Sequence, residues 1–181
     1  MGVALADCAS EMGAIVNLVL GPVDIKPQSK DINIINVTTA DSMAEACLSL
    51  FSGCDIAILA AAVADFTPIA VAGNKIKQKN AFLIKLKPTT DIAAALGKMK
   101  KQNQIIVGFA LETNDEIENA RKKLLSKNLD FIVLNSLNDK GAGFGYDTNK
   151  ITIIDSNNNI DIFELKSKEE VARDILNKIL I

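Results

Sequence analysis

Short apolar runs rich in β-branched residues alternate with longer amphipathic stretches along this chain. The alternation predicts an α/β domain with a mostly parallel sheet. Because the runs are apolar on both faces, we expect helices to cover each side of the sheet. Strands are predicted at residues 14–20, 32–37, 55–60, 104–110 and 130–135. Helices are predicted at residues 3–12, 42–50, 91–101, 115–127 and 168–181, with N-caps at residues 39–41, Thr90 and residues 114–115.

Two regions, residues 65–87 and 136–165, interrupt the alternation and are where such a domain could carry function. In the first, residues 82–87 combine apolar side chains with two lysines, and the two kinds alternate over residues 84–87. We therefore predict a half-exposed strand at residues 82–87, on a flap that leaves the main sheet. In the second, residues 151–155 and 160–165 are predicted to form a C-terminal β-hairpin. No repeat or linker divides the chain, so we expect a single domain.

The start of the chain is unusual for a nucleotide-binding α/β unit. Such a unit ordinarily opens with a strand and a glycine-rich turn. Here Met1-Gly2-Val3-Ala4 lead directly into the first predicted helix. We therefore expect either an N-terminally incomplete domain or an unusual opening of the fold.

Composition narrows the classes of function. With 181 residues, 49% hydrophobic and 23% charged, the chain fits one globular domain with a sizeable core and not a disordered segment. A net charge of −2 and a pI near 5.2 argue against a general binder of nucleic acid or anionic membranes. The longest apolar run, residues 56–64, is far shorter than the ~20 residues of a membrane-spanning helix, and no secretory leader is evident.

The sequence contains no histidine, which excludes Ser-His-Asp, Cys-His and histidine-zinc chemistry. Its three cysteines, Cys8, Cys47 and Cys54, have no C-x-x-C spacing and lie in apolar or small-residue contexts. We expect them to be reduced core thiols of a cytosolic protein.

Residues that follow the predicted strands are the first candidates for a ligand site, since ligands of open parallel sheets bind beyond the carboxyl ends of the strands. In residues 60–65, small side chains that let a flat ring or a sugar approach the backbone precede Asp65. Asp65 could hold a ribose hydroxyl or a metal, or it could cap a turn. Phe109, at another strand end, could stack on a base or belong to the core.

Two groups of lysines are candidate anion ligands. In an extended segment Lys75, Lys77 and Lys79 point one way, and they repel one another unless something anionic such as a polyphosphate neutralises them. The alternative is an exposed edge strand protected from aggregation. Lys123 and Lys127 share a face of one predicted helix, where cations are also a common complement of the helix dipole.

The order and spacing of several short motifs carry a family resemblance. The motifs are Gly21-Pro22-Val23, Val37-Thr38-Thr39-Ala40 with Met43, residues 60–65, Lys75-Ile76-Lys77, Gly108-Phe109-Ala110, Glu112-Thr113-Asn114, Lys127-Asn128-Leu129-Asp130, and Phe144-Gly145 with Asp147 and Asn149. Together they resemble phosphopantothenate-cysteine ligase, the synthetase half of the bacterial coenzyme A biosynthesis flavoprotein, over most of the chain.

This resemblance implies one Rossmann-like ligase domain over residues 1–181, acting as a cytoplasmic homodimer. The implied reaction joins 4'-phosphopantothenate to cysteine, using CTP and Mg²⁺, through an acyl-cytidylate intermediate. The nucleophiles then belong to the substrates, so the protein supplies positioning and charge stabilisation, which agrees with the absence of histidine. A phosphopantothenoylcysteine decarboxylase could be fused or associated, and no nucleic-acid or membrane partner is expected. The preference for CTP over ATP comes from the resemblance alone.

The resemblance also implies roles for individual residues. Ala61 and Phe109 are expected on the base side of the nucleotide, Asp65 at its ribose or metal, and Lys75 as the principal catalytic lysine. The remaining nucleotide contacts are expected from Thr90, Asp91, Ile92, Ala93, Lys123 and Lys127. Residues 74–87 correspond to the family's dimer-forming flap, so the partner subunit is expected to complete the site.

The chain departs from the family in three places. Lys75-Ile76-Lys77-Gln78, followed by Lys79, replaces Lys-x-Lys-Lys, and Pro88-Thr89-Thr90-Asp91 replaces a turn with Asn-Pro-Asp. Met1-Gly2 correspond to the last two residues of the family's phosphate loop, so we do not expect this stretch alone to be a competent enzyme. The alternatives are an NAD(P)- or flavin-dependent oxidoreductase, which the lack of G-x-G-x-x-G disfavours, and a non-catalytic nucleotide-binding module.

Overall fold

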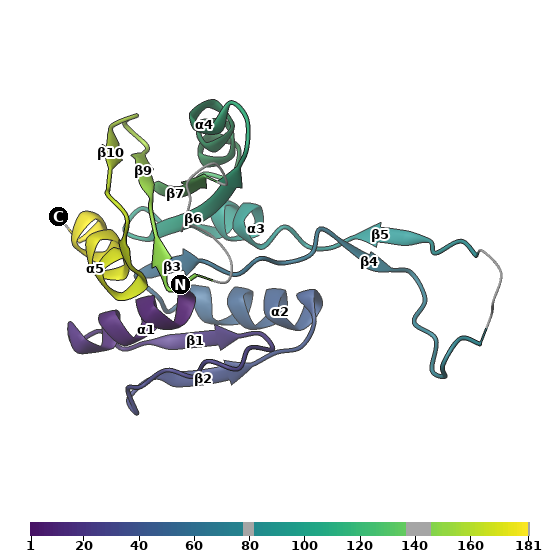
Figure 1. The fold of residues 1–181 in the computed structure, drawn as a ribbon. Coiled ribbons are helices and arrows are strands. Elements are labelled where there is room, and N and C mark those ends of the chain that lie inside the picture. The colour runs from purple at the N-terminus through teal and green to yellow at the C-terminus, as the bar shows by residue number, and fades with distance from the viewer. Residues whose placement is uncertain (78–81, 137–145, 181) are drawn as a thin grey trace.

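The computed structural model describes residues 1–77, 82–136 and 146–180 (Figure 1). Its helices are α1 (Gly2–Glu11), α2 (Ala40–Phe51), α3 (Ile92–Met99), α4 (Glu116–Ser126) and α5 (Lys168–Ile179). Each of the five predicted helices is confirmed, with ends that differ by no more than about one helical turn. Two of them, α2 and α5, open with a capping box, in which Thr39 and Ser167 are the N-caps.

The central sheet has the strand order β10-β9-β7-β6-β3. Its strands are β3 (Ile56–Leu59), β6 (Ile105–Glu112), β7 (Phe131–Ser136), β9 (Thr152–Asp155) and β10 (Ile160–Ile162). The β3–β6 and β6–β7 pairs are parallel, whereas β9 pairs antiparallel with both β7 and β10. The predicted C-terminal hairpin is thus confirmed, and it extends one edge of a mostly parallel sheet. A short pair, β8 (Thr148–Asn149) with β11 (Lys166–Ser167), precedes α5.

The first two strands stand apart from this sheet. β1 (Asn17–Leu20) and β2 (Asn33–Asn36) pair in parallel with each other, and within the described residues no ladder joins either to a central strand. Both are shorter than predicted; β1 is mostly half-buried, whereas β2 is largely exposed to solvent. Asn33 donates from its side-chain amide to Asn17 across the pair, at 2.8 Å.

Helices cover both faces of the central sheet, as predicted. Alternate residues of a strand point to opposite faces, so Ile106 and Ile132 pack with α2, α3 and α4, while Val107 and Val133 pack with α1 and α5. All four side chains are almost completely buried. The three cysteines are free thiols, and burial raises the pKa of Cys8 and of Cys47.

An arm leaves the body of the molecule between β3 and α3 (Figure 1). Its base is an antiparallel pair of β4 (Phe66–Pro68) and β5 (Leu86–Pro88). The predicted strand at 82–87 is therefore wrong over residues 82–85, which form no strand. One reason is that β4 ends at Pro68, opposite Leu86, so residues 82–85 lie beyond the end of their partner strand. The predicted flap is otherwise present.

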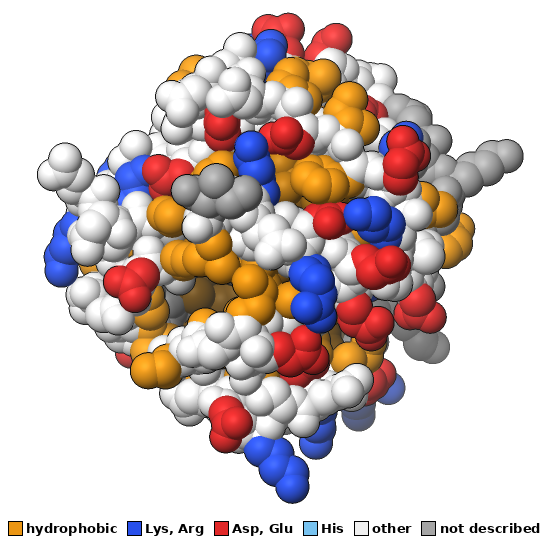
Figure 2. Space-filling view, turned by 90° about the vertical axis from the view of Figure 1, so that its left-hand side faces the viewer, with side chains coloured by type: hydrophobic (Ala, Val, Ile, Leu, Met, Phe, Trp, Pro, Cys, Tyr) orange, Lys and Arg blue, Asp and Glu red, His pale blue; other side chains and the backbone are white. Residues whose placement is uncertain are grey.

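Figure 2 shows the end of the molecule where α1, α5 and β10 lie. Acidic and basic side chains are interspersed on this face, and hydrophobic side chains gather around a shallow hollow. The described residues on this face therefore form no extended patch of one charge. Among the helices of the described ranges, none combines the length and the apolar character needed to span a bilayer.

Candidate functional site

The carboxyl edge of the sheet collects most of the predicted site residues. Leu59 of β3 pairs with Gly108 of β6, so the segment that leaves β3 starts beside Phe109. Within that segment Ala61 and Asp65 are exposed to solvent. The Phe109 ring is partly buried and packs on the α1 side of the sheet with Met1 and Ala60.

The base of the arm joins the segment after β3 to the segment before α3. The backbone N–H of Thr89 donates to the carbonyl of Asp65 at 2.9 Å, and the Thr89 hydroxyl donates to the carbonyl of Ala64 at 2.6 Å. These two bonds place Asp65 close to Thr90 and Asp91. Two regions that lie 25 residues apart in the sequence therefore form one surface.

Asp91, and not the predicted Thr90, is the N-cap of α3. Its carboxylate accepts from the backbone N–H of Ala94 at 3.0 Å, which a side chain at position 90 lies one residue too early to do. Its second oxygen, Oδ2, lies 2.9 Å from Nζ of Lys127. Burial raises the pKa of Asp91, but the hydrogen bonds from Ala94 and Lys127 and the lysine charge outweigh burial, and the net pKa is lowered.

The two predicted lysines of α4 both reach toward this edge. Helical side chains lean toward the N-terminus of their helix, and α4 starts at the carboxyl edge because it follows β6. Lys123 consequently contacts Glu112, the last residue of β6, with 2.6 Å between Nζ and Oε1. Lys127 contacts Asp91. The N-cap of α4 is Asp115, at φ 44°, and it makes no side-chain capping bond.

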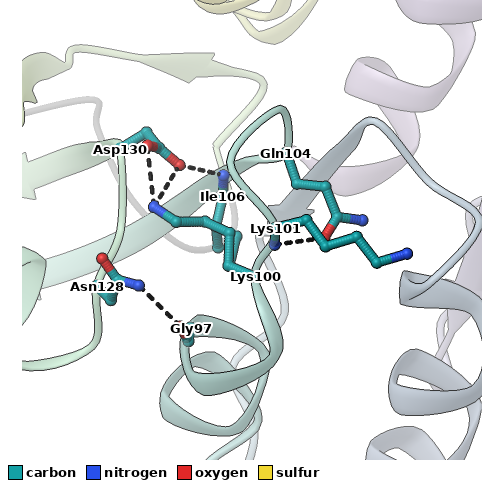
Figure 3. A network of polar contacts seen from close by, with 7 residues as sticks. All are labelled: Gly97, Lys100, Lys101, Gln104, Ile106, Asn128 and Asp130. Carbon is teal, nitrogen blue, oxygen red and sulfur yellow. Dashed lines mark hydrogen bonds and ion pairs between the residues drawn. The ribbon is translucent and has the colours of Figure 1, made fainter.

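The C-terminal end of α4 is packed directly on α3. A Cβ at Gly97 would lie 1.9 Å from the carbonyl oxygen of Lys127, so glycine is required for this approach. The Asn128 side chain, on a residue with φ 54°, donates to the Gly97 carbonyl at 2.8 Å (Figure 3). The backbone of Lys127 is therefore fixed at one end of α3 while its ammonium group reaches the other.

A second polar network lies at the opposite edge of the sheet, where β6 and β7 begin (Figure 3). Asp130 accepts from Lys100 with both oxygens and from the backbone N–H of Ile106 at 2.7 Å. Gln104, which is buried, donates to the carbonyls of Phe51 and Cys54. Asn128 and Asp130 of the family motif thus stabilise the packing of the fold, whereas Lys127 of the same motif faces the candidate site.

The structure does not bring every predicted residue together. Lys75 is exposed on the arm, and within one chain no described contact joins it to α3 or α4. Lys77 is also exposed on the arm, whereas the predicted Lys79 lies outside the described residues, as does the Phe144-Gly145 motif. Glu112 was part of a motif but had no predicted role. Its position 11 residues before Lys123, at a strand end, gave no periodic signal.

Comparisons with known proteins agree with this architecture. The sequence profile of the DNA/pantothenate metabolism flavoprotein C-terminal domain matches residues 1–181. A protein from an unknown prokaryotic organism, named Cysteine/Cysteine sulfinic acid decarboxylase, is 65% identical over 99% of this chain and 50% of its own length. The coenzyme A biosynthesis bifunctional protein CoaBC of Bacillus subtilis (strain 168) is 46% identical over 99% of this chain and 44% of its own.

A solved structure of a related protein has the same fold as this chain. The crystal structure of the C-terminal domain of coenzyme A biosynthesis bifunctional protein CoaBC is 35% identical, with a TM-score of 0.81 over 98% of this chain and 79% of that chain. The chain spans about half the length of the curated relatives it matches.

Proposed function

The chain belongs to the DNA/pantothenate metabolism flavoprotein C-terminal domain family, and from this membership we propose that it ligates 4'-phosphopantothenate to cysteine at the expense of CTP. Its family relation to CoaBC proteins supports a place in coenzyme A biosynthesis. The single observation that carries the proposal is the meeting, at one sheet edge, of Asp65, the start of α3, Lys123 of α4 and Lys127, the C-cap of α4.

The first step of the proposed reaction is activation of the acid. A carboxylate oxygen of 4'-phosphopantothenate attacks the α-phosphorus of CTP, and pyrophosphate leaves with the electron pair of the broken P–O bond. Negative charge builds up on phosphate oxygens during this step, so fixed ammonium groups and helix N-terminal N–H groups are the catalytic devices it needs. Lys123, Lys127 and the backbone N–H of Ile92 would supply them, whereas the N–H groups of Ala93 and Ala94 already donate to the Asp91 carboxylate.

The second step needs no protein nucleophile either. The cysteine amine attacks the acyl carbon of the mixed anhydride, the C–N bond forms, and CMP leaves with the electron pair of the C–O bond. The proton lost by the amine passes to solvent or to the departing phosphate. A chain without histidine can perform both steps because each nucleophile belongs to a substrate.

Mg²⁺ is the proposed metal. The described residues contain no group of three or more acidic or cysteine side chains suited to hold a metal ion. Mg²⁺ needs no such group, since one or two carboxylates together with substrate phosphates usually suffice. Asp65, an exposed carboxylate at the edge, fits that requirement. The ion would neutralise phosphate charge there.

The charge balance at the edge favours a contribution from a second subunit. Lys123 and Lys127 are each paired with a carboxylate within 2.9 Å, and Asp65 adds another negative charge. A nucleoside triphosphate would therefore need further cations, and we propose Lys75 and Lys77 of the partner's arm. The arm is strongly apolar for an exposed segment: Val71 and Leu83 are 85% and 94% exposed. A homodimer would bury such side chains.

The proposed setting is the cytoplasm, where thiols stay reduced, in agreement with three free cysteines. The decarboxylase in the name of the 65% identical relative is not transferred to this chain, because the chain matches half of that protein.

The test is an assay of the full-length protein with CTP or ATP, Mg²⁺, 4'-phosphopantothenate and cysteine. Release of pyrophosphate and CMP, with the ligated product identified by mass spectrometry, is the expected result. Binding of Mg·CTP without turnover would favour the non-catalytic module. Release of CO₂ from cysteine without nucleotide consumption would favour a decarboxylase and contradict the proposal.

A further inference from the structure

Glu112 occupies a fixed position at the edge where the proposed nucleotide binds. It is the last residue of β6, and its backbone lies opposite Ser136 of β7 in the parallel ladder. Its side chain is only 15% exposed, whereas that of Lys123 is 46% exposed. Glu112 is therefore the anchored member of the pair, and the position of the Lys123 ammonium group depends on it.

A lysine on a helix surface samples many rotamers, and ordering it when a ligand binds lowers the affinity. The neighbouring lysine, Lys122, is paired but not held toward the sheet edge. Lys122 pairs with Glu118 on the same helix at 2.8 Å, but both side chains are about two-thirds exposed (67% and 66%). That pair lies in solvent and holds neither group toward the sheet edge.

We propose that Glu112 is a positioning residue for the nucleotide. It holds the Lys123 ammonium group at the carboxyl edge of the sheet, so that the lysine meets the phosphates of a nucleoside triphosphate without first being ordered. This inference rests on the proposed function.

A carboxylate this close could have the opposite effect, because it neutralises the charge that attracts the phosphates. The two effects change the affinity for the nucleotide in opposite directions. If positioning dominates, removal of the carboxylate weakens nucleotide binding; if neutralisation dominates, removal strengthens it. Glu112 is much less exposed than Lys123, which favours positioning. Without Glu112, Lys123 would be a mobile surface side chain.

The experiment measures the Kd of Mg·CTP by calorimetry on the full-length protein, with folding checked by circular dichroism. Glu112→Ala is expected to weaken binding about three- to tenfold. Glu112→Gln is expected to weaken it less, because the amide oxygen still accepts from Lys123. Glu118→Ala, the matched control on the same helix, is expected to leave Kd unchanged. In a Lys123→Met background, Glu112→Ala is expected to have no further effect, because it acts through the lysine.

Unchanged or tighter binding by Glu112→Ala would overturn the inference. So would a loss of affinity that persists in the Lys123→Met background, since Glu112 would then act by another route. In either case CTP binding that depends on Lys123 would leave the proposed function intact. A wild-type protein that binds no Mg·CTP would overturn both.

Discussion

The ammonium group of Lys127 lies 2.9 Å from Oδ2 of Asp91, so the C-cap of α4 contacts the N-cap of α3. The contact is possible because the backbone of Lys127 rests on Gly97, two turns along α3 from Asp91. One lysine thereby connects the packing of two helices with the edge where the proposed nucleotide binds.

Replacement of Lys127 tests that connection. We expect Lys127→Met to weaken Mg·CTP binding about tenfold or more, because a charge-assisted hydrogen bond to phosphate is lost. Lys122→Met, on the solvent side of the same helix, is the control and should bind as the wild type does. Kd measured by calorimetry distinguishes them. Equal affinities for the two variants would remove Lys127 from the site.

Gly97→Ala tests the packing beneath the same lysine. Alanine is favoured over glycine in a helix by about 1 kcal/mol, but the new methyl group would lie 1.9 Å from a backbone oxygen. No side-chain rotation relieves that clash, and overpacking of this kind costs about 1–3 kcal/mol or more. We therefore expect a net loss of stability in urea denaturation.

Gly53→Ala is the control for this loss. A Cβ added at Gly53 would have the Leu50 carbonyl oxygen as its nearest neighbour, at 3.8 Å, which is an ordinary contact. We expect stability to be unchanged or slightly increased. A Gly97→Ala protein as stable as this control would mean that α3 and α4 can separate without cost.

Much of the fold was predictable because local pattern and tertiary environment agree. Strands β6 and β7 are apolar on both faces in the sequence and buried on both faces in the structure. The arm shows the limit of that reasoning. Apolar side chains and lysines alternate over residues 84–87 as they would in a strand, but strand formation needs a partner, and β4 supplies only three residues.

The positions of the candidate site residues at strand ends were predictable from the sequence, but the ion pairs between them were not. The rule that ligands bind beyond carboxyl ends places Asp65 and Phe109 at the edge. It does not reveal that Lys123 pairs with Glu112, because that pair joins a helix to a strand across a turn. Nor does it separate Lys127, which faces the site, from Asp130, which lies at the other edge and has a structural role.

Asp130 gives a prediction about stability alone. Asp130→Ala leaves the Lys100 ammonium group, only 14% exposed, without its carboxylate and the Ile106 N–H without its acceptor. We expect a loss of about 2–3 kcal/mol in the free energy of unfolding. Glu118→Ala breaks a solvent-exposed pair and should change the free energy of unfolding far less. Similar losses in the two variants would contradict the structural role of Asp130.

Lys75→Ala tests the contribution of the arm. We expect it to abolish acyl-cytidylate formation in the full-length protein while the fold stays intact, because Lys75 is exposed and has no structural contact among the described interactions. Lys85→Ala, at another exposed position on the arm, is the control. The measurement is pyrophosphate release in a single turnover. Normal release by Lys75→Ala would refute its assignment as the catalytic lysine.

The lowered pKa of Asp91 predicts how its contribution to stability depends on pH. Below its ordinary value of 3.8 the unfolded chain takes up the proton first, so the stabilisation is fully present above that pH and is lost as the pH falls through the folded-state pKa. Asp91→Asn removes this dependence. We therefore expect the difference in unfolding free energy between wild type and Asp91→Asn to be constant from pH 7 to 5 and to shrink below about pH 4.

Urea denaturation of both proteins at each pH provides the measurement. Other carboxylates with lowered pKa values, including Asp155 and Glu170, are present in both proteins and cancel in the difference. Lys127→Met in place of Asp91→Asn should give a smaller difference that shrinks over the same pH range, because the backbone hydrogen bond from Ala94 still lowers the pKa of Asp91 in that variant. A difference that stays constant down to pH 3 would show that neither the hydrogen bond from Ala94 nor the Lys127 ammonium group stabilises the charged form of Asp91 in solution.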